Sequence, residues 1–93
     1  MRSSLAHISK ELNIPSEELI NRGILAYLGH EIRLAEEDIA EIRDKYFVAS
    51  KIQLKKKINN KKIFSHPAWE DLIAWENLEG HIKKLKNAIK RIG

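Results

Sequence analysis

The chain has 93 residues and no cysteine, so it is the size of one small domain and excludes a disulfide scaffold or a thiolate metal site. A hydrophobic fraction of 43% and a charged fraction of 32% argue against disorder, and no apolar run approaches the ~20 residues of a membrane span. Since the N-terminus lacks a signal-peptide core, we expect a cytoplasmic protein that forms a single helical domain over residues 1–93.

The net charge of +4 is unevenly distributed along the chain. Residues 1–44 carry five basic and nine acidic side chains, whereas residues 45–69 carry seven lysines and no acid. Residues 70–93 are nearly balanced, with five basic and four acidic side chains. This partition is compatible with pairing between molecules, the basic segment of one against the acidic segment of another.

A short helix is the first predicted element. Ser3 or Ser4 is its expected N-cap, and its apolar positions continue to about Leu12. The following Asn13-Ile14-Pro15 interrupts it, because asparagine tolerates a left-handed turn and the residue before a proline disfavours helix.

A long helix is predicted over residues 16–46, with Ser16 as its N-cap. Apolar residues recur every three or four positions along it, and its second half has heptad spacing. Gly23 and Gly29 each cost about 1 kcal/mol relative to alanine. Either the helix simply tolerates these two glycines, or they allow the close approach of another backbone.

The second half of the chain predicts a connector helix and a final helix. Ser50 followed by Gln53 is a capping-box signature for a short basic helix that ends near Ile58. If this helix is simply amphipathic, Ile52, Leu54 and Ile58 pack inward and its lysines stay in solvent. Residues 67–92 form the clearest helix, with a proline in the first turn, acids in the first half and lysines in the second, as the helix dipole favours.

The predicted architecture is therefore all-α, with two long antiparallel helices, about 16–46 and 67–92, a short N-terminal helix and a short basic connector helix. Two paired helices bury little apolar surface, so we expect the short helices or a second chain to complete a bundle, and dimerisation is the favoured solution. The pairing can be within one molecule or between two. The expected oligomer seam consists of Leu28, Ile32, Ile39, Ile42, Leu78, Ile82, Leu85 and Ile89.

No residue pattern predicts catalysis, a metal site or a cofactor. The four histidines are far apart in the sequence, and there is no HExxH motif and no glycine-rich phosphate loop. The sequence therefore favours a non-enzymatic protein.

The basic connector is the strongest electrostatic feature. It is consistent with contacts to nucleic-acid phosphates or to an acidic protein surface, and equally with the solvated face of an amphipathic helix. The candidate phosphate-binding residues are Lys51, Lys55, Lys56, Lys57, Lys61 and Lys62.

Both tryptophans lie near the start of the last helix, six residues apart and each followed by a glutamate. This arrangement is typical of an amphipathic binding face, and it predicts a protein-partner site made of Trp69, Glu70, Trp75 and Glu76. The alternative is that the rings fill the core, which the heptad position of Trp75 favours.

Two runs carry a resemblance to a known family: the run from His66 to Glu79, HPAWEDLIAWENLE, and the run from Leu12 to Gly23, LNIPSEELINRG. Together they resemble small helical proteins of prokaryotes, often archaea, that are regarded as antitoxins of toxin–antitoxin gene pairs. The resemblance implies a protein that masks a small toxin and represses its own promoter. Two alternatives stay open, a nucleic-acid-binding module and a structural helical homo-oligomer.

Overall fold

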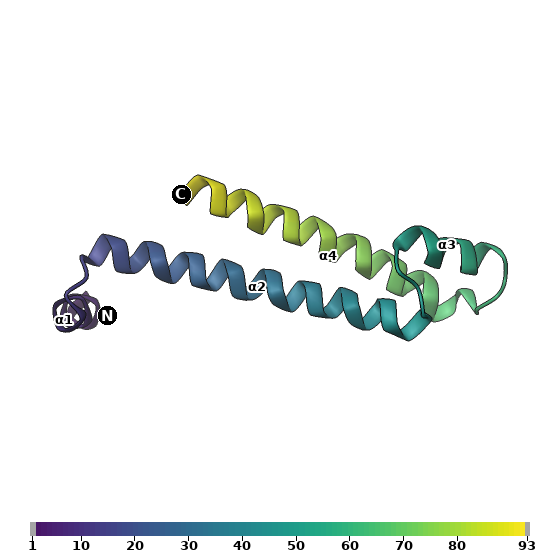
Figure 1. The fold of residues 1–93 in the computed structure, drawn as a ribbon, viewed down its shortest axis with the longest axis horizontal. Helices are drawn as coiled ribbons and strands as arrows, with labels where there is room; N and C mark the ends of the chain where they lie inside the picture. Colours follow the sequence, from purple (N-terminus) through teal and green to yellow (C-terminus); the bar gives the residue numbers. More distant parts are fainter. Residues whose placement is uncertain (1, 93) are drawn as a thin grey trace.

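Four helices form the chain in the computed structural model, which describes residues 2–92: α1 (Arg2–Leu12), α2 (Ser16–Tyr46), α3 (Lys51–Asn59) and α4 (Ser65–Ile92). The long helices α2 and α4 lie side by side and antiparallel, α3 packs at the closed end of this hairpin, and α1 lies at the far end of α2 (Figure 1). The predicted fold class is confirmed: the described residues are all-α and include no strand.

The molecule is a rod, with extents of 61 × 21 × 18 Å. The first turns of α2 and all of α1 extend beyond the C-terminal end of α4, so α4 does not cover them (Figure 1). No helix within residues 2–92 combines the length and the apolar character that crossing a membrane requires.

The first three helices end in the same way. A residue in the left-handed conformation follows each of them, with φ of 55° at Asn13, 54° at Phe47 and 57° at Lys61. In each turn that residue donates its N–H to the carbonyl three residues earlier, and the next residue donates to the carbonyl five residues earlier. These are Schellman motifs, which satisfy the last carbonyls of each helix. The prediction of a left-handed Asn13 is confirmed.

The predicted caps have different outcomes. The predicted cap of Ser50 at α3 is confirmed, since the N–H of Gln53 donates to Ser50 Oγ at 3.2 Å. The reciprocal bond of the box is shifted by one residue, because Gln53 Oε1 accepts from the N–H of Ala49 at 2.7 Å. The serine caps predicted for the first two helices are wrong. Helix α1 begins at Arg2, which places both candidate serines inside it. Pro15 is the N-cap of α2, because its fixed φ suits the extended cap conformation, and Ser16 is already helical.

The core lies at the closed end, where three helices meet. Its buried members come from the end of α2, the following loop, α3 and the start of α4: Ile39, Val48, Leu54, Ile58, Ala68, Leu72 and Trp75. Leu54 of α3 and Ala68 of α4 are completely buried. Farther along the rod, the buried residues within the described part of the chain are Leu28, Ala35 and Leu85. Helix α3 therefore makes the closed end the most densely packed part of the molecule.

The predicted oligomer seam lies inside one chain. Three of its eight residues are buried and five are partly buried, all between or beside α2 and α4: Leu28, Ile39 and Leu85, then Ile32, Ile42, Leu78, Ile82 and Ile89. Of the two pairings left open by the sequence, the single chain adopts the intramolecular one, in which α4 folds back on α2. Gly23 and Gly29 face open space, so no backbone within the chain approaches them.

Candidate functional site

Two lysines of the connector fasten α3 to the long helices. Lys57 Nζ donates to the carbonyl oxygens of Tyr46 at 2.9 Å and Phe47 at 3.4 Å, which places a cation at the negative end of α2. Lys51 Nζ lies 2.5 Å from Glu79 Oε1 on α4, and this hydrogen bond raises the pKa of Lys51. Both lysines therefore have structural roles.

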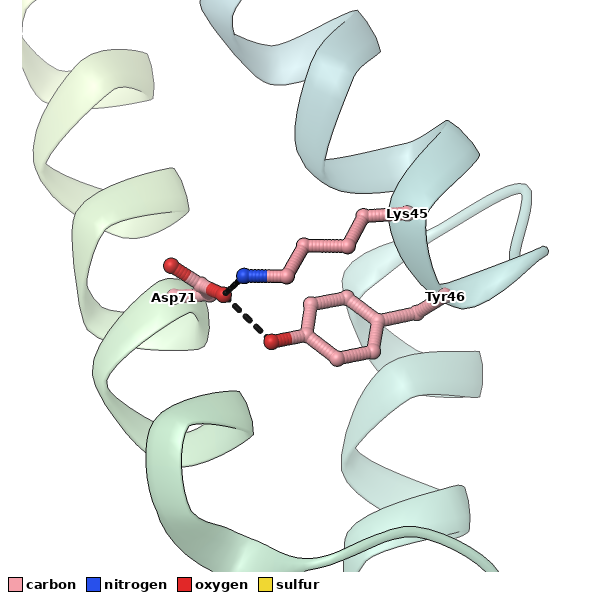
Figure 2. Close-up of polar contacts among 3 residues, drawn as sticks. All are labelled: Lys45, Tyr46 and Asp71. Atoms are coloured by element: carbon pink, nitrogen blue, oxygen red, sulfur yellow. Dashed lines mark hydrogen bonds and ion pairs between the residues drawn. The ribbon is translucent and has the colours of Figure 1, made fainter.

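A carboxylate also links the end of α2 to the start of α4. Figure 2 shows Lys45 and Tyr46 of α2 converging on Asp71 of α4. Lys45 Nζ donates to Asp71 Oδ2 at 2.9 Å, and the hydroxyl of Tyr46 donates to the same oxygen. The hydrogen bond from Tyr46 and then that from Lys45 lower the pKa of Asp71, whereas burial and the hydrogen bond to Asp71 raise the pKa of Tyr46.

These pKa shifts point to a structural clasp. They keep the Asp71 carboxylate ionised and the Tyr46 hydroxyl protonated over a wider pH range than in a free chain. A general acid or base needs the opposite, a pKa moved toward neutrality. The cluster therefore joins the two long helices through one shared carboxylate oxygen.

The six candidate phosphate-binding lysines fall into two groups. Lys51 and Lys57 make the contacts within the chain described above. The other four, Lys55, Lys56, Lys61 and Lys62, are exposed on α3 and the turn after it. Only these four are free to meet an external anion.

The outer face of α3 is more apolar than predicted. Leu54 and Ile58 are buried, as the amphipathic pattern implies, but Ile52 is 68% exposed. The inward placement of Ile52 is wrong, because a residue two positions before Leu54 points about 200° away from it around a helix. Ile52 thus lies on the solvent face with the exposed lysines.

The predicted tryptophan site is divided between surface and core. Trp75 is buried and belongs to the core cluster, so its assignment to partner binding is wrong. Trp69 is 46% exposed, and Glu70 and Glu76 are exposed on α4. Glu70 Oε1 lies 3.2 Å from His66 Nδ1 at the start of the helix. Trp69 is the one predicted aromatic that is available to a partner.

Other large apolar side chains of the closed end are exposed as well, in a way that the sequence did not predict. Phe47 and Phe64 are each 89% exposed, and Ile73 lies one turn after Trp69 on the same side of α4. We call the exposed apolar residues of the closed end the tip surface: Phe47, Ile52, Phe64, Trp69 and Ile73. The one signal for Ile73 is its position next to Leu72, off the apolar track of α4.

An open groove of about 930 Å³ runs between the end of α2 and the start of α4. Aromatic side chains and cations share its walls, among them Tyr46, Phe64, Lys45, Lys61 and Lys62. The groove and the tip surface meet at Phe64. Apolar contact area beside unpaired lysines suits a partner that is both apolar and acidic.

Residues that could bind a metal do not converge in the part of the chain that the structure describes. No three histidine or carboxylate side chains there lie close enough together to hold an ion. His7 and His66 each lie near a glutamate one helical turn away, at 2.9 Å from Glu11 and 3.2 Å from Glu70, on the exposed surface.

Comparison with known proteins gives a family and no closer relative. The profile of the Uncharacterized protein MJ0235 family matches residues 1–93. No curated protein and no solved structure gives a significant match. Because the profile covers all 93 residues, the chain belongs to the Uncharacterized protein MJ0235 family.

Proposed function

We propose that this protein is a non-enzymatic, antitoxin-like binding protein that masks a small toxin protein through the tip surface. The observation that carries the proposal is the exposure of two phenylalanines, a tryptophan and two isoleucines around one end of the rod. Exposed apolar surface is a feature of protein-binding sites, and aromatic residues supply most of the binding energy at such sites.

Phe47 gives the most specific support. Its φ of 54° is in the left-handed region, which costs a residue other than glycine about 1–2 kcal/mol. Its side chain is 89% exposed, so packing within the chain does not offset this cost. Glycine or asparagine suits the position better. A phenylalanine there is explained if its ring is buried by a partner.

The partner of the tip surface has an apolar centre and an acidic rim. Exposed lysines adjoin the apolar residues: Lys55, Lys56, Lys61 and Lys62. Opposite charges at the rim speed association and favour one orientation, while the apolar residues at the centre provide affinity. The toxin implied by the family resemblance is therefore a small protein with carboxylates around an apolar cleft.

The proposal is tested with the product of the gene adjacent to this one. Expressed alone, that product should arrest growth, and coexpression with this protein should restore it. Replacing both Trp69 and Ile73 by alanine should weaken the measured affinity at least tenfold and abolish protection, because both side chains are exposed anchors of the tip surface.

Ile8→Ala with Leu12→Ala is the matched control, since it removes two exposed apolar side chains from the opposite end of the rod. This variant should protect cells as well as the unmodified protein does. Unchanged affinity of the Trp69 and Ile73 double variant would contradict the proposal.

A nucleic-acid interface is the second candidate function, and the four exposed connector lysines favour it. Changing Lys55, Lys56, Lys61 and Lys62 to glutamine should reduce the salt dependence of DNA binding by about 3–4 in log K against log salt. The control changes four lysines of α4 instead: Lys83, Lys84, Lys86 and Lys90. Equal losses in both variants, measured by electrophoretic titration at two salt concentrations, would mean that binding is nonspecific attraction to positive charge.

A further inference from the structure

The open groove at the closed end carries positive charge that no carboxylate on its walls offsets. Lys45, Lys61 and Lys62 line it, and none of its lining residues is an aspartate or a glutamate. Lys45 is already paired with Asp71. Lys61 and Lys62 are exposed and form no ion pair within the described residues. The groove therefore has two cations available to an anionic ligand.

The residues around the groove do not cancel this charge. Residues 43–71, which include all of its walls, carry eight basic and three acidic side chains, a net charge of +5. Asp71 is engaged in the clasp with α2, and Glu70 lies 3.2 Å from His66. The third acid, Asp44, is exposed near the end of α2. An anion is therefore attracted to this end of the rod.

Phe64 adds an aromatic ring to the same groove. It is 89% exposed, so packing within the chain does not explain its position. It follows Lys61 by three residues and Lys62 by two, and all three side chains line the groove. Nucleic-acid bases stack on exposed aromatic rings, and nearby cations contact the phosphates of the same strand. One ring and two free cations in one groove therefore suit an unpaired base and its flanking phosphates.

The backbone that carries the two lysines is already fixed. The N–H of Lys61 donates to the carbonyl three residues earlier at 3.1 Å, and the N–H of Lys62 donates to the carbonyl five residues earlier at 3.0 Å. Ile58 before this turn is buried in the core, and Ile63 after it packs against the core. A site whose backbone is ordered in advance loses less conformational freedom when a ligand binds.

We propose that the groove binds single-stranded nucleic acid, with a base stacked on Phe64 and the adjoining phosphates at Lys61 and Lys62. This inference rests on the second candidate function, the nucleic-acid interface, and names its ligand; it does not depend on toxin masking. Protein-binding interfaces are depleted in lysine, whereas surfaces that bind nucleic acid are much more positively charged. DNA and RNA share the base faces and phosphates that these three side chains would contact, so the ligand class includes both.

The same residues argue against a duplex as the ligand. In a duplex the bases stack on one another, so Phe64 would reach a base face only by forcing two of them apart. The commonest reader of base edges in the major groove is arginine, and the chain has none between Arg43 and Arg91. Lysines act as point charges that any phosphate satisfies. The groove therefore distinguishes unpaired from paired strands, without preference for one sequence.

Fluorescence anisotropy with a labelled oligothymidine of about 12 nucleotides tests the proposal. The unmodified protein should bind this strand at least tenfold more tightly than a duplex of the same length. Phe64→Ala should weaken binding of the single strand about five- to 150-fold, the range for loss of one stacked base, and leave binding of the duplex unchanged. Phe64 is exposed, so the variant should keep its helical circular dichroism.

Phe47→Ala is the matched control, because Phe47 is equally exposed and does not line the groove. It should leave binding of the single strand unchanged. Since Phe47 belongs to the tip surface, the same variant should weaken binding of the toxin, which separates this inference from toxin masking. Changing both Lys61 and Lys62 to glutamine should reduce the slope of log K against log salt by about 1.4 for the single strand, whereas the same change at Lys83 and Lys84 of α4 should not.

Three results would overturn the proposal. Equal affinity for single strand and duplex, or unchanged affinity of Phe64→Ala for the single strand, would leave the nucleic-acid interface in place and remove the stacked base. Binding of neither nucleic acid would contradict the interface as well. Tighter binding of a polyglutamate peptide with the same number of charges would assign the groove to an acidic protein segment.

Discussion

Replacing Trp75 by alanine should lower the free energy of unfolding by about 3–5 kcal/mol, the usual cost of emptying a buried aromatic site. The ring is 3% exposed and belongs to the cluster that joins α2, α3 and α4. Because neighbours from three helices contribute to this cluster, no single helix can move to fill the cavity. Urea denaturation followed by circular dichroism, at one fixed protein concentration, measures the change.

Trp69→Ala provides a matched control, because it removes the same side chain from the same helix at a site that is 46% exposed. We expect a loss of no more than about 1 kcal/mol for this variant. If Trp75→Ala also shifted the curve by less than 1 kcal/mol, the closed end would not be the core of the fold.

The sequence predicted the parts of the fold that depend on local chemistry. The apolar track of the last helix, the N-cap of Ser50, and the left-handed turn at Asn13 all depend on neighbouring residues, and the structure has each of them. The N-caps predicted at Ser3 or Ser4 and at Ser16 are wrong because neighbouring residues begin these helices earlier. The preference of serine for the N-cap position does not decide which of several adjacent residues occupies it.

The exposure of particular side chains could not be predicted, because it depends on where α3 docks. The same apolar track is compatible with helix pairing within one chain or between two chains. The hairpin geometry is what buries Leu28 and Leu85 within the single chain. Phe47 and Phe64 have no periodic context, so no pattern indicated that both would be exposed. The candidate site was therefore predicted at Trp69 and missed at its other members.

Asp71→Asn should lower the free energy of unfolding at pH 7 by about 1–3 kcal/mol, the range for hydrogen bonds that involve a charged group. Its carboxylate accepts from both Tyr46 and Lys45, and it joins the two long helices near the closed end. Asp44→Asn is the control, because Asp44 is exposed at the end of α2, next to Lys45, and its replacement should change stability by less than about 0.5 kcal/mol.

The pH dependence of stability distinguishes the loss of the Asp71 charge from a packing defect, because only the first effect should disappear in acid. The pKa of Asp71 is lower in the folded chain than its usual 3.8, so the unfolded chain binds the proton more readily in acid. The stabilisation by Asp71 is complete above about pH 4 and is lost as the pH falls through the lower folded value. Tyr46 acts in the opposite direction: its pKa is raised above 10.0, so its stabilisation is complete below that pH and is lost as the pH rises through the higher folded value. The free energy of unfolding of the unmodified protein should therefore exceed that of Asp71→Asn at pH 7, and the difference should vanish in strong acid. Denaturation curves at the two pH values measure this difference. An equal difference at both pH values would mean that the clasp does not depend on the charge of Asp71.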